Sequence, residues 1–474
     1  MPTGLADVLH DAAVLHRLVG FIGEYCKEQE RSQTYVGSAR LFFEYVEQLV
    51  SGTQDNLGLE VERASRFPKR LPTPRRNIRT LKLYLRSLHT LIKPAADAHT
   101  LTVPGPLVDL AYQQLQSIDG MRGSNLLVLL TPEFMYFQRP HTEVKDQARI
   151  IQSFIPKAAF PQKLGFIELP YSQGPSFFTN LAIYHEIGHF VYEELANRNP
   201  PHSGFEALTR VIGRSLNRVF GLRSSNGRKV EKNRQAFAIG HRILEDWTQE
   251  IFCDLFALRL LGPAFSFALI EMMGMLGFLS QAQCETFNPT HPAPSCRFAE
   301  HVRMLREDSW WDAISDVQAE QKKLLEKMAT ISRYKFFLDE RRAGPEKLRD
   351  EFVNSVVPVI RKLARQVTAR AIPSVGRFQK VRSSIEGCLG AGVVPLTDTP
   401  DKCDPVAIIN SAFCFYLTSV PKVIEKFEKT EHHNSVATYS RWTKRIEMWS
   451  LKALEDAQIM TRFKRYGKNG PVSK

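Results

Sequence analysis

Apolar side chains recur at three- and four-residue spacing through most of the chain, which predicts a mainly helical protein. From Leu5 to Val50 this spacing is typical of amphipathic helices. Three prolines in the segment 66–77 interrupt the pattern, since proline removes a helical hydrogen bond, and a helical pattern resumes over 78–92. We therefore expect residues 1–100 to form a helical N-terminal region.

A different pattern occupies the middle of the chain. Continuous apolar runs stand at 126–131 (LLVLLT), 134–137 (FMYF) and 164–169 (LGFIEL), with prolines and glycines between them. Such runs are typical of buried strands, so we expect a small β-sheet. An exposed strand edge at 164–169 is expected to bind an extended peptide by backbone pairing.

Helical spacing returns after Tyr171 and continues to the C-terminus. Ser176 is the expected N-cap of a helix that ends before Asn199, and a polar loop is expected at 223–229. A second helix is expected from His241 to Leu261.

From Arg297 onward we expect almost only helices, interrupted at 387–405. The fold class is therefore mainly α with a small β-sheet (α+β). It is divided into a basic helical region at 1–100, a central core at 101–300 and a helical C-terminal region at 301–474. The apolar residues of 324–337 are interpreted as core, with a helical docking surface for another chain as the alternative.

The most apolar stretch is Leu260–Leu279. Gly262 and Pro263 break its start and Glu271 lies inside it, so it is shorter than the roughly 20 residues that span a bilayer. We expect a buried core helix and no transmembrane segment, with attachment along a membrane surface as the alternative.

Charge adds one candidate surface. The 474-residue chain carries a formal net charge of +13, and the segment 61–93 holds ten lysines and arginines against the single acid Glu62. Basic clusters attract nucleic acids and anionic surfaces, so residues 61–93 are a candidate phosphate-binding segment. The alternative is a solvated basic face, because no nucleic-acid motif accompanies the charge.

The seven cysteines are scattered and form no C-x-x-C pair. Together with an N-terminal sequence that has no continuous apolar stretch, this pattern predicts reduced thiols and a cytoplasmic location.

The sharpest motif is His185-Glu186-Ile187-Gly188-His189, an H-E-x-x-H within a predicted helix. Residues four apart share one helix face, so both imidazoles can bind one zinc ion. Glu186 is then placed to take a proton from a zinc-bound water, whose pKa is lowered to about 7. The alternative is a helix face with two ordinary histidines.

A catalytic zinc site needs a third protein ligand. One class of zinc proteases supplies a histidine six residues after the motif, but that position holds Leu195. Glu250 is the favoured ligand, because the helix around it is apolar and a buried carboxylate needs a partner. Asp254, one turn later, is placed to accept a hydrogen bond from a ligand histidine. Glu245 and Asp246 are the competing ligands.

Three motifs occur in one order: HEIGH at 185–189, EIFCDLFA at 250–257 and THPAPSCR at 290–297. This series resembles the signature of gluzincin metallopeptidases, nearest to the CAAX prenyl protease type, although the membrane spans of that type are not expected here. The resemblance implies a zincin-like core at 101–300, Zn²⁺ held by His185, His189 and Glu250, and Glu186 as general base. It also implies that Asp254 orients His185.

For two residues of the third motif the resemblance implies supporting roles. His291 would stabilise the oxyanion of the tetrahedral intermediate, and Arg297 would brace a carboxylate of the site. The leading hypothesis is therefore a soluble zinc endopeptidase acting on a protein or peptide. The alternative is a nucleic-acid-associated regulator that uses the same fold as a scaffold and binds phosphates through residues 61–93.

Overall fold

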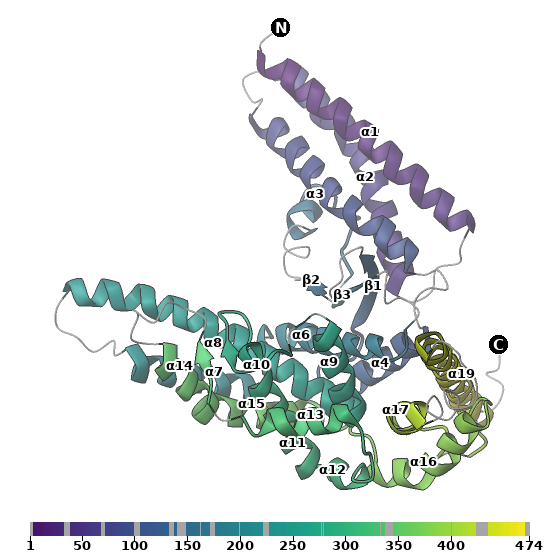
Figure 1. The fold of residues 1–474 in the computed structure, drawn as a ribbon. Coiled ribbons are helices and arrows are strands. Elements are labelled where there is room, and N and C mark those ends of the chain that lie inside the picture. The colour runs from purple at the N-terminus through teal and green to yellow at the C-terminus, as the bar shows by residue number, and fades with distance from the viewer. Residues whose placement is uncertain are drawn as a thin grey trace. The chain divides into compact units, whose positions relative to one another are not determined.

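The structure is a computed structural model of the chain, and its described part leaves out short segments between elements (Figure 1). The described residues are 3–32, 38–67, 72–98, 105–131, 137–139, 148–161, 163–170, 176–198, 200–220, 227–275, 277, 279–331, 333–336, 345–399, 401–422 and 435–469. They form two compact units. Unit 1 is residues 1–103 with 123–174, and unit 2 is residues 104–122 with 175–474.

Three long helices form the larger part of unit 1. They are α1 (Thr3–Ser32), α2 (Ser38–Arg66) and α3 (Pro72–Asp97), and each packs against the other two. The apolar stripe of each helix faces the shared core, as Leu15, Val46 and Leu85 illustrate, all of which are buried. The helical N-terminal region expected from the sequence is present.

The prolines of 66–77 were expected to precede the next helix, but two of them lie inside it. Because α3 begins at Pro72, both Pro72 and Pro74 fall within its first turn. The first N–H groups of a helix have no partner inside it, so a proline there costs no hydrogen bond. Residues 68–71 lie outside the described residues.

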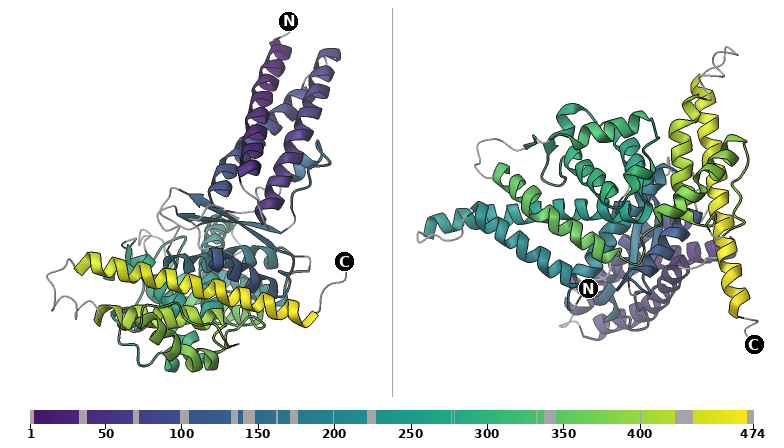
Figure 2. Two further views of the ribbon diagram at one scale, coloured as in Figure 1. Left: turned by 90° about the vertical axis from the view of Figure 1, so that its right-hand side faces the viewer. Right: turned by 90° about the horizontal axis from the view of Figure 1, so that it is seen from below.

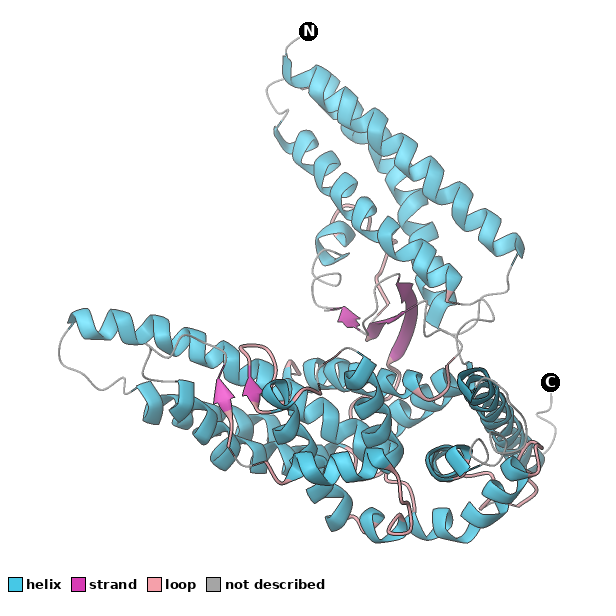
Figure 3. Cartoon of the chain, in the orientation of Figure 1, coloured by secondary structure: helices cyan, strands magenta, loops and turns pink. Residues whose placement is uncertain are grey.

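A three-stranded sheet completes unit 1 (Figure 3). Strand β3 (Leu164–Pro170) pairs in parallel with β1 (Asn125–Thr131) and antiparallel with β2 (Phe137–Arg139). Every residue of β3 is buried, which accounts for a sequence that is apolar except for Glu168. The expected exposed edge at 164–169 is wrong, because β3 is the central strand and β2 already pairs with residues 166–168.

Unit 2 is mainly helical. Its elements up to β4 are α4 (Gly105–Ser117), the 3₁₀ turn η3 (Thr179–Ala182), α6 (Ile183–Ala196), α7 (Ser203–Phe220), α8 (Gly227–Leu261), α9 (Pro263–Met275), α10 (Gln281–Cys284) and β4 (Thr286–Phe287).

The second half of the unit follows. It consists of α11 (Pro294–Glu307), α12 (Trp310–Ala313), α13 (Glu320–Ala329), β5 (Lys335–Phe336), α14 (Pro345–Glu351), the π-turn η4 (Phe352–Val356), α15 (Val357–Val367), α16 (Val375–Gly390), α17 (Pro405–Thr418) and α19 (Ser435–Asn469). In Figure 2, α19 runs alongside α17, which also packs on α16. The interruption expected at 387–405 falls between α16 and α17.

Helix α8 begins earlier than the expected His241. It starts at Gly227, within the expected loop at 223–229, of which residues 223–226 lie outside the described residues. Between 234 and 239 its residues are exposed or half-buried, so no apolar stripe marks this part of the helix. The stripe appears only where the helix enters the core, at Ile243, Leu244 and Trp247.

Helices α8 and α9 divide the most apolar stretch of the chain. The chain turns at Gly262, whose φ of +68° favours glycine, and α9 starts at Pro263. Most of α9 is buried, as expected for a core helix. In the described part of the chain, no helix is both long and apolar enough to cross a bilayer.

Helix α13 contains part of the segment 324–337, whose apolar residues were expected to lie in the core. Leu325 and Met328 are buried, whereas Leu324 is only half-buried. The side chains of Phe336 and Phe337 lie outside the described residues.

Candidate active site

Helix α6 carries the H-E-x-x-H motif and is anchored at its start by the C-terminal helix. Ser176 Oγ donates to the Oε1 atom of Glu447 at 2.6 Å, and the backbone N–H groups of Phe177 and Phe178 donate to the same oxygen at 3.1 and 3.3 Å. Ser176 Oγ also accepts from the N–H of Thr179 at 3.4 Å, at the start of η3. The expected N-cap role of Ser176 is wrong, because the N-cap of η3 is Phe178 and that of α6 is Ala182.

Helix α6 packs closely on α8 through a glycine. A Cβ atom built on Gly188 would lie 2.8 Å from the Cα atom of Cys253, which is closer than real side chains approach. Gly188, the fourth residue of the motif, therefore allows the two backbones to approach closely. This contact sets the faces of α6 and α8 against each other.

The two motif histidines face one carboxylate on α8. His185 Nε2 lies 3.4 Å from Glu250 Oε2, and His189 Nε2 lies 3.4 Å from Glu250 Oε1. These separations exceed the 2.7–3.2 Å typical of N–H···O hydrogen bonds. They match the roughly 3.3 Å between two ligand atoms that each lie about 2.0 Å from a tetrahedral zinc ion. The donor set of two imidazoles and one carboxylate thus fits zinc.

Asp254 fixes the orientation of His185. The Nδ1–H of His185 donates to Asp254 Oδ1 at 2.9 Å, which leaves Nε2 as the ring nitrogen that faces Glu250 and could bind an ion. Burial lowers the pKa of His185, but the charges of Glu250 and Asp254 outweigh it and raise this pKa to about 10. In the metal-free chain, the imidazole is therefore held as a cation between two carboxylates.

Arg297 of α11 joins the two carboxylates of α8. Its Nε donates to Asp254 Oδ2 at 2.6 Å, its Nη2 donates to Asp254 Oδ1 at 2.7 Å, and its Nη1 lies 3.2 Å from Glu250 Oε2. Burial alone would raise the pKa of Glu250 and of Asp254. The cationic neighbours Arg297 and His185 outweigh burial and hold both values well below the usual range.

Glu186 is buried beside this network but is not part of it. Its carboxylate forms no hydrogen bond or ion pair with another described residue. A general base must have an oxygen available to accept a proton from water. The side chain is therefore available for that role.

His291 lies at the rim of the cluster. Its Nε2 is 3.7 Å from Glu250 Oε1, and its side chain is 51% exposed. The loop is held by Asn288, whose Oδ1 accepts from the His291 N–H at 2.7 Å and whose carbonyl accepts from Trp247 Nε1 at 2.7 Å. Partial burial lowers the pKa of His291, which keeps the imidazole neutral near pH 7.

Cys253 is an alternative third ligand. Its Sγ and ring nitrogens of His185 and His189 all lie within 4.8 Å of one another. Burial raises the pKa of this thiol well above its usual value, whereas a metal ligand must be deprotonated. Glu250 is already ionised and faces both imidazoles, so we favour Glu250.

The competing ligands expected from the sequence lie away from the imidazoles. Glu245 is exposed and pairs with His241 Nδ1 at 3.1 Å, and Asp246 is half-buried. In the described part of the chain neither forms an ion pair with His185 or His189.

Sequence reasoning missed His301. This histidine is fully buried on α11, with Nε2 3.7 Å from Asp254 Oδ2 and Nδ1 3.0 Å from Ser266 Oγ. It stands four residues after Arg297 and so shares that residue's helix face. This i, i+4 relation is the signal that could have identified it.

The chain was also compared with known proteins. A scan against protein-family models, a search of curated proteins and a search of solved structures each found no match.

Proposed function

We propose that the chain is a zinc-dependent endopeptidase with a zincin-like core of the gluzincin type. His185, His189 and Glu250 would hold the ion, and Glu186 would act as general base. The supporting observation is the pair of 3.4 Å separations that join both imidazoles to the Glu250 carboxylate. Zinc bound there supplies a Lewis acid, which lowers the pKa of water and polarises a carbonyl oxygen.

Different side chains of the site would carry out the remaining steps of peptide hydrolysis. Glu186 accepts a proton from the attacking water, whose oxygen bonds to the peptide carbonyl carbon, and then passes that proton to the leaving amine nitrogen as the C–N bond breaks. His291, half-exposed beside Glu250, donates a hydrogen bond to the carbonyl oxygen as negative charge develops. Asp254 and Arg297 hold the ligands in place and touch no substrate.

Glu186→Gln tests the proposal most simply. We expect this variant to bind zinc like the parent protein while cleavage of fluorescently quenched casein falls by about a hundredfold or more, because the base is lost. Glu326→Gln, on the exposed face of α13, is the matched control and should cleave at the parent rate. Full activity in Glu186→Gln would contradict the proposed role of Glu186.

The exposed face of α3 supports a second candidate function, binding of a polyanion by residues 61–93. Arg76, Arg79, Arg86 and Lys93 are exposed, and their spacing places them along one helix face. None of the four forms an ion pair with a described residue. In contrast, Arg75 and Lys82 of the same helix pair with Asp7 and Asp11 of α1.

Titration with a labelled 20-base single-stranded DNA at several salt concentrations tests this surface. Four phosphate contacts predict that log K falls with log [NaCl] with a slope of about −3. Arg79→Gln with Arg86→Gln should weaken binding and flatten the slope, whereas Arg370→Gln in unit 2 should do neither. Affinity that does not change with salt would overturn the candidate.

The cytoplasmic location expected from the cysteine pattern stays a prediction.

A further inference from the structure

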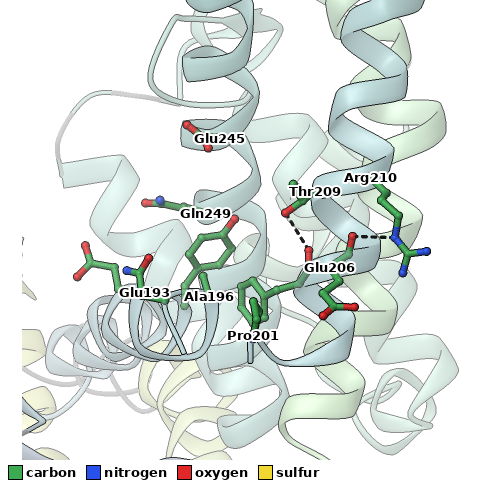
Figure 4. A pocket seen from close by; sticks show the side chains of 11 residues that line it. Glu193, Ala196, Pro201, Glu206, Thr209, Arg210, Glu245 and Gln249 are labelled. Carbon is green, nitrogen blue, oxygen red and sulfur yellow. Dashed lines mark hydrogen bonds between the residues drawn. The ribbon is translucent and has the colours of Figure 1, made fainter. Parts of the chain in front are cut away.

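A cavity of about 600 Å³ opens between α6, the start of α7 and α8 (Figure 4). Its lining holds three acids, Glu193, Glu206 and Glu245, against one base, Arg210. The Nε of Arg210 donates to the backbone carbonyl of Glu206 at 3.2 Å and not to its carboxylate. Glu245 also lies 3.1 Å from His241 Nδ1, outside the lining. Three carboxylates against one guanidinium still give the lining an excess of negative charge, which favours a cationic guest.

The cavity adjoins the proposed zinc site. Glu193 stands four residues after His189, so it shares the face of both motif histidines and lies about 6 Å further along the axis of α6. On the opposite helix, Gln249 lines the cavity and directly precedes Glu250. A peptide with its scissile bond at the site could thus place a neighbouring side chain in the cavity.

Tyr192 adds a hydroxyl group to the lining of the cavity. It is only 8% exposed, lines the cavity and packs edge-on against Phe205 and Phe252, at ring centroid distances of 4.9 and 5.4 Å. Its hydroxyl has no hydrogen-bond partner among the described residues. The hydroxyl is not among the buried polar atoms of the described residues, so a guest in the cavity can reach it.

We propose that this cavity binds the side chain of a lysine or arginine in the peptide substrate, next to the scissile bond. The proposal rests on the proposed peptidase function. The carboxylates would receive the cationic head group, and Tyr192 Oη would accept one of its N–H bonds. The apolar stem would pack on Phe205, Ala196 and Pro201. A bare divalent ion suits the space less, because it needs oxygen ligands at about 2.0–2.6 Å on all sides.

Binding to the Glu186→Gln protein loaded with zinc separates recognition from cleavage. The probes are a labelled alanine-rich peptide with one central arginine and the same peptide with citrulline, which keeps the shape but removes the charge. We expect the arginine peptide to bind about tenfold more tightly by fluorescence anisotropy. Equal affinities would overturn the proposal.

Substitutions of residues that line the cavity test whether the arginine side chain binds there. Glu245→Gln should reduce the preference for arginine several-fold, and Tyr192→Phe should weaken binding of the arginine peptide, while Glu326→Gln should change neither. An unchanged preference in both lining variants would place the guest elsewhere and overturn the proposal.

Cleavage of the same two peptides by the parent protein distinguishes the two proposals. Cleavage of both peptides at one rate, with equal binding, would support the peptidase and overturn the cavity assignment. Preference for arginine in binding, with cleavage of neither peptide, would support the cationic site and overturn the peptidase.

Discussion

The same kind of ion pair occurs in two different environments in this molecule. In unit 2, Arg297 and Asp254 are joined at 2.6 Å with side chains that are 6% and 1% exposed. In unit 1, Arg75 and Asp7 are joined at 3.0 Å with side chains that are 45% and 54% exposed. Water screens the second pair and not the first, so similar contacts differ greatly in what they contribute.

The difference in burial helps to distinguish charges that position site residues from charges that only pair on the surface. Arg75 and Asp7 pair on the surface of the N-terminal helices, where such pairs contribute about 0–1 kcal/mol. The candidate active site buries several charged groups together, and Glu250, Asp254, Arg297 and His185 each lie beside at least one opposite charge. Buried ion pairs are weak evidence for stability, so we interpret this cluster as positioning the proposed zinc ligands.

The largest expected effect breaks the buried pair. Arg297→Met removes the charge at similar volume and leaves Asp254 and Glu250 buried with His185 as their remaining close cation, which should lower the free energy of unfolding by about 3–5 kcal/mol. Arg75→Met, its exposed counterpart, should cost less than about 1 kcal/mol. Urea unfolding of the two variants measures both values. Equal costs would mean that burial does not distinguish the two pairs.

A smaller effect is expected at the contact between α6 and α8. Gly188→Ala places a methyl group 2.8 Å from the backbone of Cys253, which overpacks the helix pair and should cost about 1–3 kcal/mol as well as weaken zinc binding. Gly213→Ala on α7 is the matched control. No atom lies within 4 Å of its added Cβ, so the better helix propensity should stabilise by about 0.5–1 kcal/mol. Destabilisation by both variants alike would contradict the close approach at Gly188.

Glu271 on α9 provides a pH-dependent test of the cost of burial. Burial, aided by Glu447, raises its pKa to about 7 from 4.5 despite a hydrogen bond from Tyr416. Because the folded state then binds the proton more tightly than the unfolded state, this residue makes stability fall as pH rises from about 4.5 to 7. Glu271→Gln should therefore be more stable than the parent above pH 7, by on the order of 1–2 kcal/mol, and similar below pH 4.5. Thermal unfolding across this range measures the difference, and parallel pH profiles would contradict it.

Local spacing in the sequence was enough to anticipate much of the candidate site. Helical periodicity places His185 and His189 on one face, and the same rule relates Glu250 to Asp254. The structure brings all four together with Arg297. Helical spacing relates His301 to Arg297, but it cannot report which helix faces pack together. The contact of His301 with Asp254 depends on the packing of α11 on α8 and was not predicted.

The fold shows the same limit. The mainly helical class and the small sheet follow from periodicity, and the structure has both. The order of strands is a tertiary property, so the central position of β3 was not anticipated. Likewise, the basic count of 61–93 took no account of Asp7 and Asp11, which come from α1 and pair with two residues of that segment.

X-ray absorption at the zinc edge of the purified protein tests the central claim most directly. The account predicts one zinc ion per chain with only nitrogen and oxygen ligands at about 2.0–2.1 Å, and loss of that ion in Glu250→Ala but not in Cys253→Ala. A sulfur ligand at about 2.3 Å, lost in Cys253→Ala, would contradict the assignment of Glu250, and a protein that binds no zinc would contradict the site itself.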